Sequence, residues 1–330
     1  MQASASEAAT ARSLSKPRLV VCSAEGEAKE TSSSELQRKS EAKNELPSCR
    51  LFMILARSAP MAVIFRRGPS KWVESIKWNT HTDTVEYGQW FKGRIYERRC
   101  DLSPDGTLLI YFASKINAHT VKDQEYTYAW TAISKPPWLT ALALWPKGDC
   151  WQGGGLFEDD KTVLLNHKPQ YASPHPKHVP QGLVVCANPQ AQGEDDPIYS
   201  SRLTRDGWKV QQEWQVRYEY GKGGFITDSP EIRMRRHSTR PLRLSLTRTL
   251  SRLVYKELFV LETDAGQPVL DLRNADWADW DHSGRLVFLM SGKLIVGTFD
   301  ETNQIVCREL ADFNSQRPEA KVAPDWAARW

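Results

Sequence analysis

Short apolar or alternating segments recur along the chain from Met61 onwards, and clusters of Gly, Pro, Asn, Asp and Ser separate them. This is the pattern of β-strands joined by turns. Residues 242–255, "LRLSLTRTLSRLVY", have helical spacing but also alternate well enough for a pair of strands. The predicted strands are 61–66, 72–78, 85–92, 94–101, 107–113, 125–133, 138–145, 155–158, 162–166, 182–187, 207–219, 258–262, 268–273, 276–281, 285–290 and 293–299. So many short strands with almost no helix predict an all-β sandwich, barrel or propeller.

Two stretches share one order of turn and strand. In "DLSPDGTLLIYFASK" (101–115), the turn Pro104-Asp105-Gly106 precedes an apolar strand. In "DWDHSGRLVFLMSGK" (279–293), the turn His282-Ser283-Gly284 precedes another. Each glycine supplies the positive φ that a tight hairpin requires. The two stretches therefore read as copies of one repeat.

Weaker copies lie elsewhere in the chain. Residues 202–214 carry one around Asp206-Gly207, and residues 144–157 carry a degenerate one. The glycine anchors then fall at 106, about 153, 207 and 284. This spacing predicts repeats of about 45–50 residues, with one unrecognised repeat between 215 and 260.

The stretch "LSPDGTLLIYFAS" resembles the Pro-Asp-Gly repeats of Tol-type periplasmic propellers and of the propellers attached to prolyl peptidases. It is similar, more distantly, to Trp-Asp repeat propellers. The pairing of "RRCDLSPDG" with "ADWADWD" also resembles an uncharacterised group of bacterial proteins. The chain lacks the secretion signal of the Tol-type proteins and the G-x-S-x-G elbow of the peptidases. The resemblance therefore implies a type of repeat and no catalytic chemistry. It implies an irregular β-propeller of about five blades, with a β-sandwich as the alternative.

The N-terminal region differs from the rest. Residues 1–50 contain no aromatic residue and little apolar content, which predicts disorder. Met61 opens "MAVIFRRGPSKWVESIKW", which reads like a natural start of translation followed by a strand. We therefore predict a disordered extension over 1–60 that has no structural role and could lie outside the natural protein, a propeller over 61–313 and a tail over 314–330. The tail is expected to lay Trp326 and Trp330 against the body.

Composition is that of an ordinary globular protein, with 40% hydrophobic and 25% charged residues. The net charge of +4 argues against a general polyanion binder but leaves room for a local basic patch. No segment approaches the roughly 18 apolar residues of a membrane span, and Arg57 and Pro60 interrupt the apolar stretch 51–65. A cytoplasmic protein without membrane contact is the expectation.

Cysteine and histidine positions bear on metal binding. No C-x-x-C spacing occurs, which argues against a zinc knuckle or a reactive dithiol and favours reduced, mostly buried thiols. Three imidazoles within 166–178 could bind zinc or copper. Proline and serine lie between them, and no cysteine or carboxylate is suitably spaced, so a solvated loop is the favoured interpretation. Neither a metal nor another cofactor is predicted, and the weak metal candidates are His167, His175 and His178.

A basic run over 232–256 contains eight positive side chains and no acid. It could bind nucleic-acid phosphates or an anionic protein surface, or it could be a solvated strand face that acidic loops balance. No aromatic residue precedes Tyr255 in the run, so the stacking groups of single-strand binders are missing. The candidate polyanion-binding residues are Arg233, Arg235, Arg236, Arg240, Arg243, Arg248 and Arg252.

Catalytic residues stay unassigned at this level. The glycine-rich stretches 153–155 and 220–227 lack the context or spacing of phosphate-binding loops. The pairs Asp159-Asp160 and Asp195-Asp196 fall in predicted exposed loops, and no nucleophile, base and acid form a recognisable set.

Two classes of function remain. The first and favoured one is a non-catalytic binding or protein-interaction scaffold with a protein partner, nucleic acid being the less favoured partner. The alternative is a hydrolase or lyase with its active site in the central funnel. Histidine, acidic and arginine side chains converging in one central pocket would favour the enzyme, whereas a flat basic or aromatic face with an empty funnel would favour the scaffold.

Overall fold

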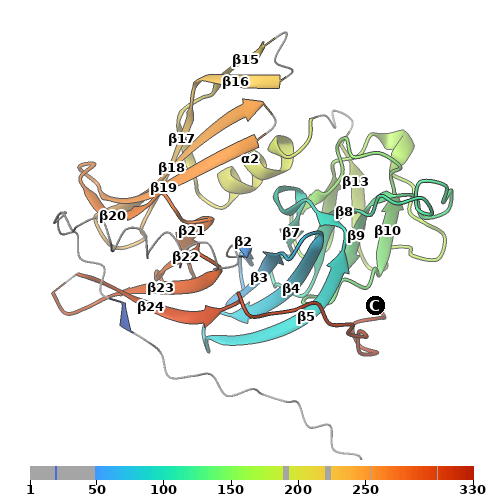
Figure 1. Ribbon diagram of the computed structural model, residues 1–330, viewed down its shortest axis with the longest axis horizontal. Helices are drawn as coiled ribbons and strands as arrows, with labels where there is room; N and C mark the ends of the chain where they lie inside the picture. Colours follow the sequence, from blue (N-terminus) through green and yellow to red (C-terminus); the bar gives the residue numbers. More distant parts are fainter. Residues whose placement is uncertain (1–18, 21–48, 189–192, 220–223, 253, 303) are drawn as a thin grey trace, which may run out of the picture.

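The computed structural model describes residues 19–20, 49–188, 193–219, 224–252, 254–302 and 304–330, and it is an all-β protein (Figure 1). Its strands form five sheets. Helical structure in the described part consists of one α-helix, α2 (Asp196–Arg205), and the short 3₁₀ helices η1 (Glu97–Arg99) and η2 (Pro169–Tyr171). The prediction of an all-β fold is confirmed.

Three sheets follow one another along the first half of the chain. The first sheet is antiparallel and contains β2 (Arg50–Leu55), β3 (Met61–Arg67), β4 (Trp72–Asn79) and β5 (Thr84–Lys92). The second contains β6 (Arg94–Ile95), β7 (Asp101–Leu102), β8 (Leu109–Ser114), β9 (Ala129–Ser134) and β10 (Ala143–Pro146). The third contains β11 (Gly155–Phe157), β12 (Thr162–Leu165) and β13 (Val184–Ala187), with β12 and β13 parallel.

Two more sheets follow helix α2, apart from the short strand β1, which comes from the N-terminal region. The fourth contains β14 (Lys209–Gln212), β15 (Gln215–Glu219), β16 (Gly224–Ser229), β17 (Glu231–Arg236), β18 (Leu242–Arg252), β19 (Val254–Thr263) and β20 (Pro268–Leu272). The fifth contains β21 (Trp277–Trp280), β22 (Leu286–Met290), β23 (Lys293–Phe299), β24 (Ile305–Asp312) and β1 (Leu19–Val20).

The early strands of several sheets meet at the centre of the molecule. Strand β2 contacts β7 and β21, β7 contacts β11, and α2 contacts β11 and β14. Figure 1 shows β2, β7 and β21 near the middle of the view and the later strands of their sheets farther out. Side chains from the first, second, fourth and fifth sheets share one apolar core, for example Ile64, Leu109, Leu244 and Leu286. A second core lies between the second and third sheets.

The predicted strands agree with the structure over most of the chain, but several segments differ. Residues 242–252 form one long strand, β18, so the helical alternative for this stretch is wrong. Strands β16, β17 and β24 lie in segments with no predicted strand. The weak repeat copy at 202–214 is also wrong, because residues up to Arg205 belong to α2 and Gly207, with a φ of 96°, follows its end.

The predicted domain boundary at residue 61 requires correction. Strand β2 precedes it and pairs along its whole length with β3. Leu51, Phe52, Met53 and Ile54 of this strand are buried in the main core. The segment was assigned to the extension because the polar residues before it dominate the composition. Its own apolar residues are instead an integral part of the fold.

The C-terminal segment packs on the body. The Nζ of Lys135 donates to the carbonyl oxygens of Trp326 and Arg329 at 3.0 and 2.7 Å. Trp330 packs against the second core, whereas the side chain of Trp326 is half exposed. The expectation that both tryptophans cover the body therefore matches Trp330 better than Trp326.

The described residues include five of the six cysteines. Cys49, Cys100 and Cys307 are buried, Cys150 is half-buried and Cys186 is exposed. Cys22 lies outside the described residues. No helix in the described ranges is long and apolar enough to cross a membrane.

Deleting residues 1–60 should abolish cooperative folding, whereas deleting residues 1–45 should not. Loss of β2 removes four buried apolar side chains at about 1.5–3 kcal/mol each. Their sum is comparable to the whole stability of a typical domain, about 5–15 kcal/mol. Thermal unfolding followed by circular dichroism checks this. A chain starting at Met61 that melts like the full chain would contradict the structural role of β2.

Candidate functional site

The two clear repeat copies form equivalent turns. Gly106 and Gly284 have φ values of 71° and 73°. Each donates its main-chain N–H to the residue three positions earlier, Ser103 and Asp281 respectively. The turn chemistry predicted from the sequence is therefore confirmed at both places. The strands β7 and β21 precede these two turns.

Matching carboxylates lie two residues before each of these turns. Asp101 in β7 and Asp279 in β21 are both buried. Arg205, at the end of α2, donates from Nη1 to Oδ2 of Asp101 at 2.6 Å and from Nη2 to Oδ1 at 2.9 Å. Arg235 in β17 donates to Asp279, which also accepts from Nε1 of Trp208 at 3.1 Å. The two repeats thus place one arginine–carboxylate pair each near the centre of the molecule.

A cavity of about 340 Å³ lies between β2, α2, β17 and β21. Its apolar wall comes from β2 and from three tryptophans. Its polar lining is formed by Arg57, Arg202, Arg205, Arg235, Asp206, Asp279, Asp281 and His282. Ligand sites commonly have this size and this mixture of apolar walls and a few convergent polar groups. We therefore take it as the candidate site and call it the central pocket.

Burial and charge set the protonation of the central pocket. Burial raises the pKa of Asp279, although the positive charge of Arg235 opposes the rise. Burial likewise raises the pKa of Asp206 against the charge of Arg205. Burial alone would lower the pKa of Arg205, but its hydrogen bonds to Asp101 outweigh this and raise it. Arg205 is therefore a permanent cation, and burial makes the neighbouring carboxyl group of Asp206 easier to protonate.

Two further guanidinium groups bind main-chain carbonyl oxygens. Arg57 donates from Nη2 to Phe157 at 2.9 Å and to Glu158 at 2.8 Å. Arg205 donates to the same carbonyl oxygen of Phe157 at 3.3 Å. The buried Arg202 donates to the carbonyl oxygen of Cys100. The guanidinium groups of Arg57 and Arg205 therefore lie against one shared oxygen atom.

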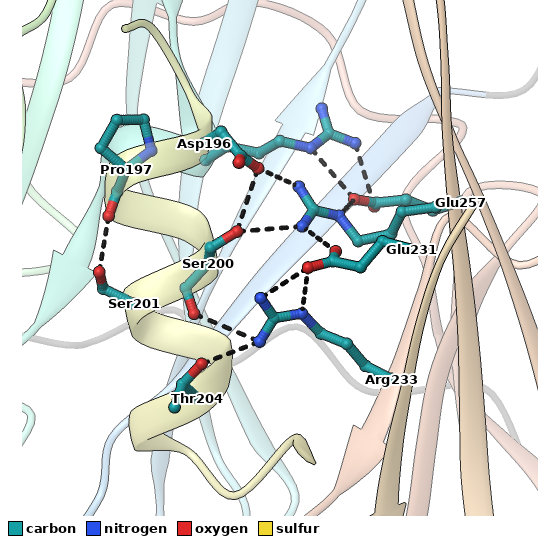
Figure 2. Close-up of polar contacts among 10 residues, drawn as sticks. Asp196, Pro197, Ser200, Ser201, Thr204, Glu231, Arg233 and Glu257 are labelled. Atoms are coloured by element: carbon teal, nitrogen blue, oxygen red, sulfur yellow. Dashed lines mark hydrogen bonds and ion pairs between the residues drawn. The ribbon is translucent and has the colours of Figure 1, made fainter. Parts of the chain in front are cut away.

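A buried set of ion pairs fixes α2 beside the pocket. Arg248 in β18 is fully buried and binds Asp196 of α2 at 2.7 Å as well as Glu231 of β17. Arg233 binds Glu231 at 2.7 Å and donates to Oγ1 of Thr204 at 2.9 Å. Figure 2 shows Asp196 and Thr204 on the face of α2 that is turned toward Glu231 and Arg233. We call this set the helix-anchoring ion pairs.

The structure divides the predicted polyanion site among several environments. Arg233 and Arg248 are buried among the helix-anchoring ion pairs, and Arg235 is paired in the central pocket. The remaining contacts are Arg236 with Asp264 at 3.3 Å, Arg243 with Glu262 at 3.1 Å and Arg240 over the ring of Phe299 at 4.1 Å. The side chain of Arg252 lies outside the described residues. Carboxylates from other elements thus pair with most of the run, and the polyanion site stays a prediction.

The three candidate metal-binding histidines do not form one cluster. The rings of His175 and His178 have centroids 5.4 Å apart. His167 is buried elsewhere, with Nε2 at 2.8 Å from Oγ1 of Thr131 and Nδ1 at 2.9 Å from the carbonyl oxygen of Tyr171. Among the described residues, no group of three or more histidine, cysteine or acidic side chains is arranged to hold a metal ion. The structure therefore does not bring the three weak candidates together as one site.

Sequence reasoning missed most of the central pocket. In the sequence, Asp279 reads only as a strand residue and His282 only as a turn residue. Arg57 reads only as a break in an apolar segment. Arg205 and Asp101 had no local signature, since they are 104 positions apart. The one available signal was the matching position of Asp101 and Asp279 before the two repeat turns.

Comparison with known proteins adds little. No protein-family model and no curated protein matches the chain. One structural match is to the crystal structure of a "putative 6-phosphogluconolactonase" from Bacteroides uniformis. It covers 79% of this chain and 95% of that one, at 7% sequence identity and a TM-score of 0.27. A likeness of this size assigns neither a fold family nor a function.

Replacing Arg248 with Met should destabilise the protein by about 3–5 kcal/mol, because it removes the buried cation that Asp196, Glu231 and Glu257 share. Urea unfolding monitored by tryptophan fluorescence measures the change. The matched control is Arg273→Met, since Arg273 is mostly exposed and pairs with the exposed Asp271. Equal unfolding midpoints for the two variants would contradict a stabilising role for the helix-anchoring ion pairs.

Acid should destabilise the protein through His167. Burial lowers the pKa of this imidazole to about 4, whereas in the unfolded chain it takes up a proton near pH 6.5. Its contribution is thus complete above pH 6.5 and is lost as the pH falls toward 4, by about 3 kcal/mol. Urea unfolding from pH 7 to 4.5 should show a steeper loss for the wild type than for His167→Gln. Parallel curves would contradict the assignment.

Proposed function

We propose that the protein is a non-catalytic binding protein whose central pocket takes a small polar ligand. The observation that carries the proposal is the convergence of four arginines, three aspartates and one histidine on a single cavity of about 340 Å³. Charged side chains are costly to bury unless they are paired or coordinate something. A fold that gathers so many around an unfilled space is best explained by a ligand that uses them.

We propose further that the five sheets are the blades of an irregular β-propeller. The sheets follow one another in sequence. Their early strands lie close together, since β2 contacts both β7 and β21, and β7 contacts β11. Equivalent turns at Gly106 and Gly284 support the resemblance to Tol-type and Trp-Asp propeller repeats. In this arrangement the central pocket lies beside β2 and β21, the early strands of the first and fifth sheets.

Binding is favoured over catalysis because two carboxyl groups of the pocket, the candidate acids and bases, are already paired with arginines. Asp279 is held by Arg235 and Trp208, and Asp206 is held by Arg205. The described residues that line the pocket include no Ser, Thr, Cys or Lys, so these four nucleophiles are missing from that lining. A protein partner on the surrounding loops is compatible with this role. Nucleic acid is less favoured because carboxylates pair with most of the basic run.

A hydrolase or lyase is the second candidate, and the notable observation in its favour is a pair of carboxyl groups. Burial raises the pKa of both Asp206 and Asp279, and the exposed His282 lies at the same pocket. Carboxyl groups with raised pKa values can act as general acids. This is the convergence of histidine, acid and arginine that favours an enzyme.

The binding proposal can be tested by thermal-shift screening of small polar metabolites. His282 is exposed at the pocket, so His282→Trp should obstruct the pocket without disturbing the core. We expect some compounds to raise the melting temperature of the wild type and not that of His282→Trp. His119→Trp, at an exposed position in another loop, is the matched control and should respond like the wild type. If no compound distinguishes the wild type from His282→Trp, the proposal is wrong.

The same compounds decide between the two candidates. Each stabilising compound is incubated with the protein and followed by proton NMR. Recovery of unchanged compound supports the binding protein. Conversion that Asp206→Asn and Asp279→Asn abolish would support the enzyme instead, because those variants lack the ionisable carboxyl groups.

A further inference from the structure

We infer that the ligand of the central pocket carries an acidic group, a carboxylate or a phosphate, bound between the guanidinium groups of Arg57 and Arg205. The inference rests on the proposed function and names the chemical class of the ligand. Its first support is geometric. Both guanidinium groups donate to the carbonyl oxygen of Phe157, at 2.9 and 3.3 Å, so they are held side by side at one edge of the pocket.

Like charges this close repel each other unless an anion lies between them. The charge of Arg205 is met by Asp101 and Asp206. Arg57 has no carboxylate within ion-pair distance among the described residues, and its bonds there go to two main-chain carbonyl oxygens. The carboxylate of Asp159 accepts from main-chain N–H groups of its own turn. These hydrogen bonds, and to a smaller extent the charge of Arg57, lower the pKa of Asp159. One positive charge at the pocket therefore lacks a partner anion.

Hydrogen-bonding capacity agrees with the charge. Arg57 uses Nη2 for both carbonyl oxygens, so Nη1 keeps its N–H donors available, and no acceptor bonds to it in the described part of the chain. Guanidinium donors match the oxygen atoms of carboxylate and phosphate groups. The half-buried position of Arg57 directly after β2 leaves the group reachable from the pocket.

The remaining pocket wall indicates what the rest of the ligand offers. Asp206, Asp279 and Asp281 present carboxyl oxygens, which accept hydrogen bonds and repel a second acidic group. The ligand that fits both walls is a small acid with one anionic end and hydroxyl or amino donors elsewhere. A neutral polar molecule would leave the charge of Arg57 without a partner.

Isothermal titration calorimetry on the full chain tests this with inorganic phosphate, the monocarboxylate glycerate and the neutral sugar ribose. We expect phosphate or glycerate to bind and ribose to bind more weakly. Arg57→Gln should weaken binding of the anion by about tenfold or more, since a hydrogen bond to a charged group is worth about 1.5–3 kcal/mol. Arg57→Lys keeps the positive charge, so its affinity for the anion should lie between those of the wild type and Arg57→Gln. Added sodium chloride should weaken binding to the wild type.

The control is Arg273→Gln, which removes a positive charge from an exposed ion pair away from the pocket and should bind the anion like the wild type. Melting temperatures confirm that each variant is folded. If phosphate alone binds, the acidic group is a phosphate. If glycerate alone binds, it is a carboxylate. Equal binding by the wild type and Arg57→Gln overturns the inference.

The inference and the proposed function fail in different ways. If neutral compounds from the screen bind in a manner that His282→Trp blocks, while neither anion binds, the pocket is a binding site for a different class of ligand and only the inference is wrong. If no compound of either kind binds, both are wrong.

Discussion

The position of helix α2 depends on the fully buried guanidinium group of Arg248. An isolated buried cation is prohibitively costly, so its carboxylate partners must be in place whenever this part of the protein is folded. Those partners come from α2 and from the fourth sheet, through Asp196 and Glu231. Because α2 also carries Arg202 and Arg205 into the central pocket, the same ion pairs that stabilise the helix determine the shape of the candidate site.

At the central pocket, too, buried carboxylates are paired with arginines, and these arginines are more accessible to solvent than Arg248. Asp101 and Asp279 occupy equivalent positions before two repeat turns, and each is paired with an arginine from a different element. Pairing offsets the cost of burying the carboxylates and holds them in fixed directions. Arg57 differs because carbonyl oxygens orient its guanidinium group without neutralising it. This difference makes the edge of the pocket near Phe157 the place where an anionic ligand group fits best.

Hydrogen bonds join segments from the two halves of the chain. The main-chain N–H of Leu51 in β2 donates to Asp276 at 3.1 Å, and that of Cys49 donates to Asn314 at 3.0 Å. These contacts join β2 to the fifth sheet without a covalent link, and β2 forms one wall of the pocket. Arg66 adds hydrogen bonds to the carbonyl oxygens of Phe313 and Gln316, at 3.1 and 3.2 Å. The integrity of the pocket therefore depends on residues near both ends of the described chain.

The sequence by itself determined the all-β character, most strands and the two repeat turns, because alternation and the positive φ of Gly106 and Gly284 are local properties. Only the tertiary structure decided the site. The run that reads as a basic patch becomes a set of ion pairs because its partners, such as Asp196 and Asp279, lie tens of residues away. Likewise, β2 looked like part of a polar extension until its pairing with β3 was known. Local backbone preference can be read along a chain, whereas the neutralisation of a buried charge depends on which distant segments the fold brings together.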